Sequence, residues 1–342
     1  MDFTNAKVLI HVKNLKIDYR SEVGPIHAVD GVSFQIRERE NLGLIGESGC
    51  GKSTIAKGLV QLVPNGSIVD GQVLLRDQDL LQLNPKQMQQ LLWNEIAMVP
   101  QAAMDSLDPV YRVGDQIVEV IRLHNAISAK DAYDQVAESF RTVGIKPDRM
   151  RDYPHHFSGG MKQRAIIAMA LVLNPSLLIL DEPTTGLDTI MQAQILDELK
   201  MLKEKFKISM LTITHDISVV EEICDAIAIM YAGEIVEYGP KDVVLDKPLH
   251  PYNLGLQNAF PSMDDDKQSL ISIPGAPPLL INPPRGYRFK DRCPFKKNHC
   301  DSEPHLEEIE PGHFSACHET AQIGTMRRLA QEVDTWQNTV TS

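Results

Sequence analysis

Over the first part of the chain, apolar residues largely alternate with polar ones or gather in short runs. The runs "VLIHV", "LKIDY" and "VSFQI" fall between Val8 and Ile36, with turn residues between them. Alternation with a period of two is typical of strands that bury one face. We therefore predict a region of antiparallel strands at the start of the chain.

Further along, short apolar runs alternate with segments of helical length. The run "NLGLI" precedes a Gly-rich loop and a helix, and "LLILDE", "SMLTITHD" and "AIAIMYAGEIVEYG" predict three more strands. The segments "TIMQAQILDELKMLKEKF" and "VVEEIC" predict helices between them. Strands that alternate with helices in this way form a mainly parallel sheet covered on both faces.

Two stretches interrupt this pattern. From about Asp105 to His156 the apolar residues are spaced by three and four, as in "VGDQIVEVIRLH", which predicts a helical insertion between two halves of one core. Residues 271–284 are rich in Pro and lack periodicity, as in "IPGAPPLLINPP", which predicts a linker or an extended, wrapped segment.

Composition and charge narrow the classes of function. The 342 residues are 43% hydrophobic and 23% charged, an ordinary globular balance. A net charge of -12 argues against a large surface for DNA or RNA. There is no apolar run of roughly eighteen residues, and the N-terminal stretch places charges among its apolar residues and lacks a small-residue cleavage site. We therefore expect a cytoplasmic chain that does not span a membrane.

The stretch "GESGCGKST" follows a predicted strand and opens a predicted helix. It satisfies the pattern G-x-x-x-x-G-K-S, in which glycines let N–H groups converge on phosphates, Lys reaches the outer phosphates and the Ser hydroxyl ligates Mg²⁺. The residues predicted to bind nucleotide here are Gly46, Glu47, Ser48, Gly49, Cys50, Gly51, Lys52, Ser53 and Thr54. This is the P-loop arrangement, so the expected fold is an α/β P-loop NTPase core with a mainly parallel sheet.

A second strong signal is "SLLILDEPTTGLD", an apolar strand that ends in two carboxylates. Asp181 at the strand end is placed to hold the Mg²⁺ shell, and Glu182 is placed to orient and polarise an attacking water. Gln101 after "MVP" and His215 after "LTIT" also follow apolar strands, but each is a weak signal by itself.

The stretch "FSGGMKQR" carries a second candidate anion-binding loop. Ser158, Gly159 and Gly160 open a predicted helix and present backbone N–H groups. One nucleotide needs only one phosphate cradle, so the second loop requires its own explanation.

In this order, "GESGCGKST", "MVPQ", "FSGGMKQR", "LLILDEP", "TGLD" and "THD" resemble the ATP-binding subunit of an ABC transporter over about Lys7 to Gly239. The resemblance implies that the Ser-Gly-Gly loop of one subunit lies against the nucleotide in the P-loop of another. Phe157 and Met161 stand where the family usually has Leu and Gln. Because Ser158, Gly159 and Gly160 carry the phosphate contacts, we expect little loss.

The resemblance also assigns roles by position. It implies that Gln101 contacts Mg²⁺ and water, that His215 contacts the γ-phosphate, and that Tyr19 stacks on adenine. Sheet packing is the alternative role for Tyr19. Asp188 is expected at the contact between two ATP-binding subunits.

Regions without a catalytic task resemble the oligopeptide and dipeptide permease ATPases. They include "QAAMDSLDPVYRVGDQIVEVI", "HPYNLGLQNAFP" and "IPGAPPLLINPP". This implies an ATPase at the cytoplasmic face of the membrane that energises import of peptides. It works with a second ATPase subunit, two transmembrane permease subunits and an extracellular solute-binding protein. The expected domains are 1–260, with a helical subdomain at about 102–157, and a C-terminal Pro- and Cys-rich extension at 261–342 that lies outside every motif touching nucleotide.

Cys293, Cys300 and Cys317 in the extension suggest a metal or iron–sulfur site, because soft thiolates favour such ions. The subfamily is associated with a [4Fe–4S] cluster and often has a fourth Cys where this chain has Tyr287. Three thiolates with a substitute ligand are one interpretation, and a tail of ordinary reduced thiols is the other. The substitute ligands to consider are His299, His313 and His318.

Three other functions compete with peptide import. The same mechanism serves other solutes, such as oligosaccharides, in some relatives. A soluble ABC ATPase acting on nucleic acid or ribosomes is disfavoured by the single ATP-binding half, the acidic balance and the lack of heptads. A subunit that does not hydrolyse ATP is disfavoured by the complete set of Lys52, Asp181, Glu182 and His215.

Overall fold

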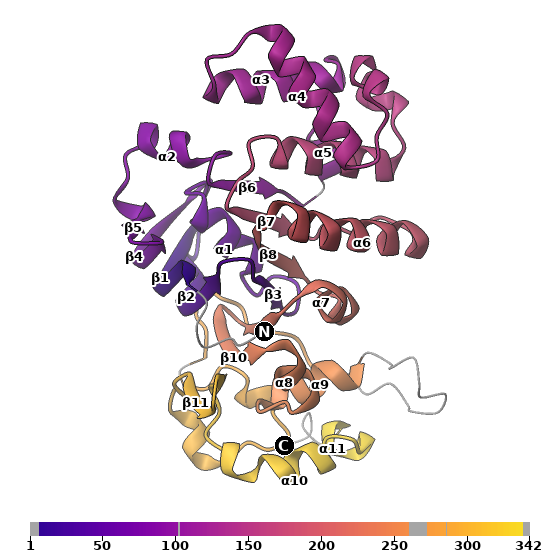
Figure 1. The fold of residues 1–342 in the computed structure, drawn as a ribbon. Coiled ribbons are helices and arrows are strands. Elements are labelled where there is room, and N and C mark those ends of the chain that lie inside the picture. Colours follow the sequence, from indigo (N-terminus) through magenta and orange to yellow (C-terminus); the bar gives the residue numbers. More distant parts are fainter. Residues whose placement is uncertain (1–6, 102, 260–271, 285, 338–342) are drawn as a thin grey trace. The chain divides into compact units, whose positions relative to one another are not determined.

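The computed structural model describes residues 7–101, 103–259, 272–284 and 286–337 (Figure 1). These residues form two compact units. The first unit comprises Ile36–Asn41, Leu75–Thr214 and the described residues before His11. The second unit comprises His11–Gln35, Leu42–Leu74 and the described residues from His215 onward. Each unit therefore combines segments that are far apart in the sequence.

The first unit contains three parallel strands in the order β8-β7-β6. They are β6 (Ile96–Val99), β7 (Leu177–Asp181) and β8 (Ser209–Thr214), with a two-residue β5 (Gln78–Asp79) earlier in the unit. Every residue of β7 and β8 is buried, as expected for continuous apolar strands in a parallel sheet. Because the strands are parallel, their carboxyl ends lie at one edge.

The helices of the first unit confirm the predicted helical insertion. They are α2 (Pro85–Leu91), α3 (Val113–His124), α4 (Ala129–Thr142), α5 (Gly159–Leu171) and α6 (Thr189–Phe206). Ser128 caps α4 by accepting a hydrogen bond from the backbone of Asp131, and the helix buries Val136 and Phe140. Figure 1 shows α3 and α4 side by side near α5.

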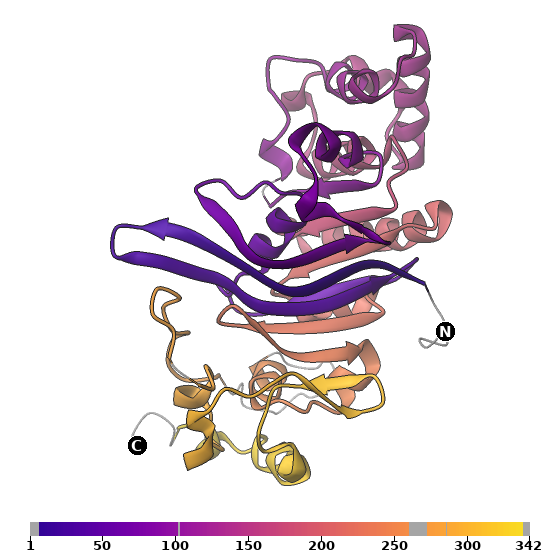
Figure 2. The same ribbon diagram turned by 90° about the vertical axis from the view of Figure 1, so that its left-hand side faces the viewer.

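Most of the second unit's N-terminal part is a pair of long strands, β1 (Val8–Ser21) and β2 (Gly24–Arg37), with β4 (Gly66–Leu75) beside β1 (Figure 2). Two residues join β1 to β2, so the pair is antiparallel, as predicted. The runs "VLIHV" and "LKIDY" belong to one strand rather than two. Asn14 between them has a φ of 47°, and β1 runs through this irregularity without a break.

A second sheet segment of this unit has the order β11-β12-β10-β9-β3. Its strands are β3 (Asn41–Ile45), β9 (Ala226–Tyr231), β10 (Glu234–Pro240), β11 (Glu307–Glu310) and β12 (His313–Ser315). Here β3 and β9 are parallel, whereas β10 is antiparallel to β9. The expectation of one strand over "AIAIMYAGEIVEYG" was wrong, because Ala232 and Gly233 have φ values of 48° and 90° and form a tight hairpin turn.

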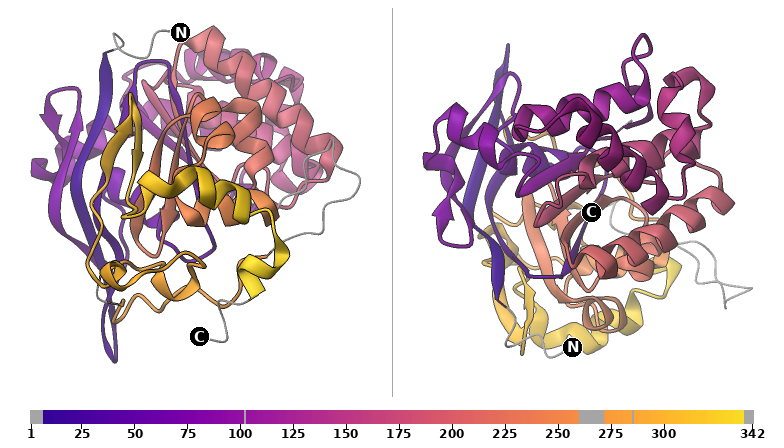
Figure 3. Two further views of the ribbon diagram at one scale, coloured as in Figure 1. Left: turned by 90° about the horizontal axis from the view of Figure 1, so that it is seen from below. Right: turned by 45° about the horizontal axis from the view of Figure 1, so that its top comes forward.

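The C-terminal residues pack into the second unit rather than trailing from it. The left panel of Figure 3 shows yellow β12 along β10, in agreement with their antiparallel pairing. Phe289 is buried against the rings of Tyr231 and Tyr252, at centroid distances of 5.1 Å and 5.4 Å. The helices here are α1 (Lys52–Leu59), α7 (Ile217–Ile223), α8 (Lys241–Asp246), α9 (Pro251–Ala259), α10 (Ile323–Leu329) and α11 (Val333–Gln337).

The Pro-rich stretch was predicted to be a linker or a wrapped segment. Its first residue lies outside the described residues, and residues 272–284 form no helix or strand. The backbone carbonyl of Leu280 accepts a 2.8 Å hydrogen bond from the backbone of His27 in β2. This contact favours a wrapped segment.

Candidate functional site

The Gly-rich loop lies in the second unit between buried strand β3 and helix α1. An added Cβ would come within 2.2 Å of the Met230 carbonyl at Gly46 and within 2.1 Å of the Ala28 carbonyl at Gly51. Gly49 has a φ of 81°. No side chain caps α1. The close backbone approach and uncapped helix start are the features of a phosphate cradle, so these residues fit the triphosphate of a nucleotide.

Lys52 is buried at the first position of α1, and its ammonium group lies over the loop. Its Nζ donates to the carbonyl of Gly46 at 2.7 Å and to the carbonyl of Glu47 at 2.9 Å. Burial raises the pKa of the neighbouring Cys50 thiol. Cys50 is therefore a small side chain that fills the loop, rather than a reactive thiolate.

Tyr19 comes from β1 and approaches the start of α1 in the same unit. Its hydroxyl lies 3.4 Å from the Thr54 hydroxyl. Ser53 occupies the second position of α1. Tyr19 is half-buried, so part of its ring is accessible to a ligand.

The two carboxylates lie in the first unit at the end of β7. Asp181 is the last residue of β7 and is 2% exposed. Glu182 follows with a φ of 52°, a conformation that non-Gly residues adopt at a cost. Its backbone N–H donates to Ile213 at 2.9 Å, and one of its carboxylate oxygens accepts from the Thr185 hydroxyl at 2.7 Å. These contacts hold the backbone so that Asp181 is buried, whereas Glu182 is half-buried.

Gln101 and His215 follow the ends of β6 and β8, the two strands on either side of β7. Gln101 comes two residues after β6 and His215 directly after β8, and both side chains are exposed. Because β6 and β7 are parallel, Gln101 and Asp181 lie beyond the same edge of the first unit's sheet.

The Ser-Gly-Gly loop begins α5 in the first unit. Ser158 is the N-cap, and its Oγ accepts from the backbone of Met161 at 3.3 Å. Gly160 is buried, and a Cβ there would lie 1.9 Å from the terminal methyl of Met191, a flexible side-chain end that would have to shift. Ser158 and Gly159 are exposed. The loop therefore presents a helix N-terminus to solvent.

Two neighbours of this loop have structural roles of their own. Phe157, which replaces the usual Leu, is buried and packs edge-on against Phe140 at 6.5 Å. Asp188 caps α6 through a 2.9 Å bond from the backbone of Met191 and is exposed. The replacement of the usual Leu by Phe157 therefore lies in the hydrophobic core.

The three tail thiols gather around Tyr287. The Tyr287 hydroxyl hydrogen-bonds Cys293, and it lies 2.9 Å from Nε2 of His250. Burial, reinforced by the nearby Cys293, raises the pKa of Tyr287. Burial also raises the pKa of Cys293, and it raises that of Cys317 to about 12, so both thiols are protonated when no metal is bound.

Each candidate substitute ligand has a partner at one ring nitrogen, whereas Nδ1 of His313 is buried without a hydrogen bond. His299 pairs with Glu319, His313 with Glu237 and His318 with the carbonyl of Ser302. Within the described residues, no group of three or more His, Cys, Asp or Glu side chains is placed to hold a metal ion. The tail residues therefore do not fit a [4Fe–4S] cluster as arranged.

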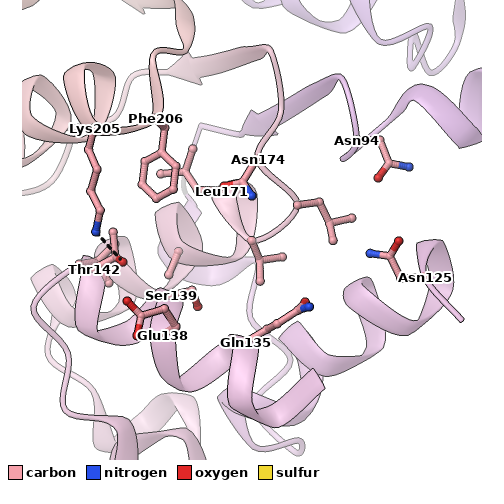
Figure 4. Close-up of a pocket in the computed structure, with 14 residues that line it drawn as sticks. Asn94, Asn125, Gln135, Glu138, Ser139, Thr142, Leu171, Asn174, Lys205 and Phe206 are labelled. Atoms are coloured by element: carbon pink, nitrogen blue, oxygen red, sulfur yellow. Dashed lines mark hydrogen bonds between the residues drawn. The ribbon is translucent and has the colours of Figure 1, made fainter. Parts of the chain in front are cut away.

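A pocket of about 480 Å³ lies in the first unit between α4 and the C-terminal ends of α5 and α6. Figure 4 shows Lys205 hydrogen-bonded to Thr142 on one side of it, with Asn94 and Asn125 on the opposite side. Its lining includes none of the predicted nucleotide-site residues. It is a separate surface feature with a mixed polar and apolar lining.

Sequence reasoning missed one part of the loop's environment. Arg292 pairs with Glu47, 245 residues away, at 2.9 Å and 3.0 Å. The backbone N–H of Glu47 also donates to the Tyr252 hydroxyl at 2.9 Å. No local sequence pattern predicts a contact between residues so far apart in the chain.

Among the residues that the structure describes, no helix has both the length and the apolar character needed to cross a membrane.

Two protein families match the chain. The ABC transporter family matches residues 29–185, and the family described as the C-terminal region of oligopeptide/dipeptide transporters matches residues 236–300. The oligopeptide transport ATP-binding protein OppD of Escherichia coli K12 is 41% identical over 91% of this chain and 93% of its own length. The dipeptide transport ATP-binding protein DppD of Lactococcus lactis is 42% identical over 90% of this chain and 89% of its own.

Two solved structures have a fold similar to that of this chain. The dimeric ATP-binding cassette MJ0796 bound to ADP and Pi matches with a TM-score of 0.61 and 25% identity, over 68% of this chain and 98% of that one. The cbiO1 subunit of a Clostridium perfringens ABC transporter complex matches with a TM-score of 0.60 and 24% identity, over 70% of this chain and 92% of that one.

Proposed function

The chain belongs to the ATP-binding subunits of oligopeptide and dipeptide ABC transporters, and we propose that it hydrolyses ATP to energise the import of peptides. The observation that carries this proposal is the Gly-rich loop, where Gly46 and Gly51 press against backbone carbonyls and Lys52 lies over the loop. Relatives named for peptide transport supply the solute class. An oligosaccharide importer would use the same ATP chemistry.

Each residue of the proposed nucleotide site has a distinct task. The N–H groups of Gly46–Thr54 and the Lys52 ammonium bind the phosphates, and Tyr19 stacks on adenine. Ser53, Gln101 and Asp181 hold Mg²⁺, which neutralises charge on the phosphates when it is bound with ATP. Glu182 orients and polarises the attacking water, and His215 contacts the γ-phosphate.

A second subunit is proposed to complete each site. Ser158, Gly159 and Gly160 would face the nucleotide held by a partner's P-loop, and Asp188 would lie at the contact between the subunits. The exposed helix start at Ser158 supports this role, because such an end binds anions through its N–H groups. The dimeric form of the related cassette also supports it.

The proposed assembly places the chain peripherally at the cytoplasmic face of a membrane. Its partners are a second ATPase subunit, two transmembrane permease subunits and, indirectly, an extracellular solute-binding protein, without nucleic acid. We propose an ATP-binding domain over residues 1–260, with a helical subdomain at about 102–157, and an extension over 261–342. Two separate family matches support two regions, and the second of them, over residues 236–300, begins before residue 261.

An iron–sulfur cluster is not part of the proposed function. Cys293, Cys300 and Cys317 surround a Tyr287 hydroxyl rather than a fourth thiol, and the histidines nearby have other partners. The cofactors of the proposal are ATP and Mg²⁺ alone.

The direct test is phosphate release from ATP by the purified full-length chain. We expect Mg²⁺-dependent hydrolysis that Lys52→Ala and Glu182→Gln each abolish. Hydrolysis that persists in both variants would exclude the proposed site.

A further inference from the structure

The C-terminal extension contacts the phosphate-binding loop directly through Arg292. Arg292 closes the short 3₁₀ helix Lys290–Arg292, and its Nη1 and Nη2 donate to the two carboxylate oxygens of Glu47 at 2.9 Å and 3.0 Å. The two side chains are 8% and 25% exposed. This bidentate, largely buried pair differs from a surface ion pair, because its geometry is fixed and water screens it weakly.

The Arg292 guanidinium is itself held by several neighbours. Nε donates to the carbonyl of Pro274 at 3.0 Å, and Nη1 lies 3.3 Å from the Tyr231 hydroxyl. The Tyr231 ring lies beneath the guanidinium, with its centroid 5.7 Å away. These contacts aim the planar donor group at Glu47, a geometry that Lys cannot reproduce.

Glu47 connects this guanidinium to the residue proposed to reach the phosphates. Its side chain binds Arg292, its N–H donates to the Tyr252 hydroxyl, and its carbonyl accepts from Lys52 at 2.9 Å. Glu47 is thus fixed at its side chain, its N–H and its carbonyl. Its anchors come from the extension, from α9 and from the first residue of α1.

The pairing also answers an electrostatic difficulty. Glu47 places a negative carboxylate in a loop that must bind a polyanion, and like charges weaken such binding. The guanidinium neutralises the carboxylate and holds it in a defined position. The loop thereby keeps an acidic residue without exposing its charge to the phosphates.

We propose that Arg292 is a positioning residue for the ATP site, through which the C-terminal extension sets the affinity of the P-loop for nucleotide. This inference rests on the proposed ATPase function. The sequence placed the extension outside every motif that touches nucleotide, whereas Arg292 pairs with a residue of the Gly-rich loop itself. The proposed effect is local. A change that moves Arg292 is expected to act on ATP binding rather than on the catalytic carboxylates.

The test compares ATP binding by full-length variants. The chain is purified as wild type, Arg292→Gln, Glu47→Gln and the double variant, and Mg²⁺-ATP binding is measured by calorimetry beside the melting temperature and the KM and kcat for ATP. Arg292→Gln should weaken ATP binding by about tenfold. In the turnover assay, this variant should raise the KM for ATP more than it lowers kcat. The double variant should bind ATP more tightly than Arg292→Gln alone, because it removes the carboxylate left without its partner.

Arg327→Gln is the matched control. Arg327 also donates to backbone carbonyls of the same unit, those of Lys247 and Pro248, which lie outside the Gly-rich loop. This variant should lose stability without changing ATP affinity. Equal weakening by Arg327→Gln, or wild-type affinity in Arg292→Gln, would overturn the proposal.

Two further variants keep the outcomes separate. If Arg292→Gln does not fold, Arg292→Lys retains the charge without the fork and should bind ATP more weakly than the wild type. Wild-type affinity in Arg292→Lys counts against the proposal. Lys52→Ala tests the site itself. If it binds ATP as the wild type does, the nucleotide-site assignment fails. If it abolishes binding while Arg292 variants behave as wild type, only the role of Arg292 fails.

Discussion

The Thr185 hydroxyl donates a 2.7 Å hydrogen bond to Glu182, which stands in the left-handed region with a φ of 52°. A backbone conformation of this kind costs free energy and persists only where neighbouring contacts hold it. The Ile213 carbonyl accepts the Glu182 N–H and provides one such contact. The arrangement presents the Glu182 carboxylate beyond the strand end, separate from buried Asp181.

Glu182→Gln should retain ATP binding and lose turnover by about a hundredfold or more, because the amide cannot accept the proton of the attacking water. Single-turnover phosphate release and ATP binding are measured on the same preparation. Thr185→Ala is the matched variant and should have a smaller effect. Near-normal steady-state hydrolysis in Glu182→Gln would remove Glu182 from the catalytic role.

Lys52→Ala should weaken ATP binding itself by about tenfold or more, because it strips the buried ammonium from the phosphate cradle. Equilibrium binding of a fluorescent ATP analogue measures the change. Lys57, in the last turn of the same helix, is the control, and Lys57→Ala should bind ATP normally. Equal affinity in Lys52→Ala and the wild type would refute the assignment of the Gly-rich loop.

Ser158→Arg should block dimer closure while leaving ATP binding to the monomer intact, because the side chain adds bulk at an exposed helix start. Mixed dimers sharpen the test. With Lys52→Ala in one subunit and Ser158→Arg in the other, both lesions fall on one ATP and one composite site stays intact. Loss of nucleotide from both sites would contradict an arrangement shared between subunits.

The local motifs could be predicted from the sequence because each depends on neighbouring residues. The bounds predicted for α6 were right, since its apolar spacing and the Asp188 cap are local signals. The β9–β10 hairpin was missed because Ala232 and Gly233 interrupt an apolar run without a polar break. The pair of Arg292 and Glu47 was missed because tertiary packing alone brings the extension to the loop.

Tyr287→Cys tests the tail. The wild-type chain is expected to carry no stoichiometric iron or sulfide when purified anaerobically. The variant places a fourth thiol beside three others, so it should gain iron and colour. It should lose roughly 3 kcal/mol or more of stability, because it removes both the buried hydrogen bond to His250 and the packing of a buried ring. Tyr287→Phe is the control, since it loses that bond without adding a thiol. Iron and sulfide in the wild type would show that the cluster forms without a fourth Cys.

Stability should fall as the pH rises through the range set by Glu198. Burial raises the pKa of Glu198 from 4.5 to about 7, and Arg164, with its Nε 3.1 Å away, opposes this only in part. Between these values the folded chain binds more protons than the unfolded chain, so the free energy of unfolding decreases as pH increases. Burial also raises the pKa of Glu234, to about 7.

Glu198→Gln should remove the part of this pH dependence of stability that comes from Glu198. Urea unfolding at about pH 5 and about pH 8 is compared in both proteins, and the stability of the wild type should fall more than that of the variant between the two conditions. The side chain of Gln cannot titrate, so any dependence left belongs to other groups such as Glu234. Equal slopes in the two proteins would mean that Glu198 is ionised throughout this range.

The most direct measurement of the central claim is ATP-driven uptake of a labelled peptide into liposomes that contain this chain with its co-encoded permease subunits and solute-binding protein. The wild-type chain should support peptide accumulation that depends on ATP, and Glu182→Gln should abolish it while the assembled complex stays intact. A labelled oligosaccharide is tested in parallel. Uptake of the sugar without the peptide, or peptide uptake that Glu182→Gln leaves unchanged, would contradict the account.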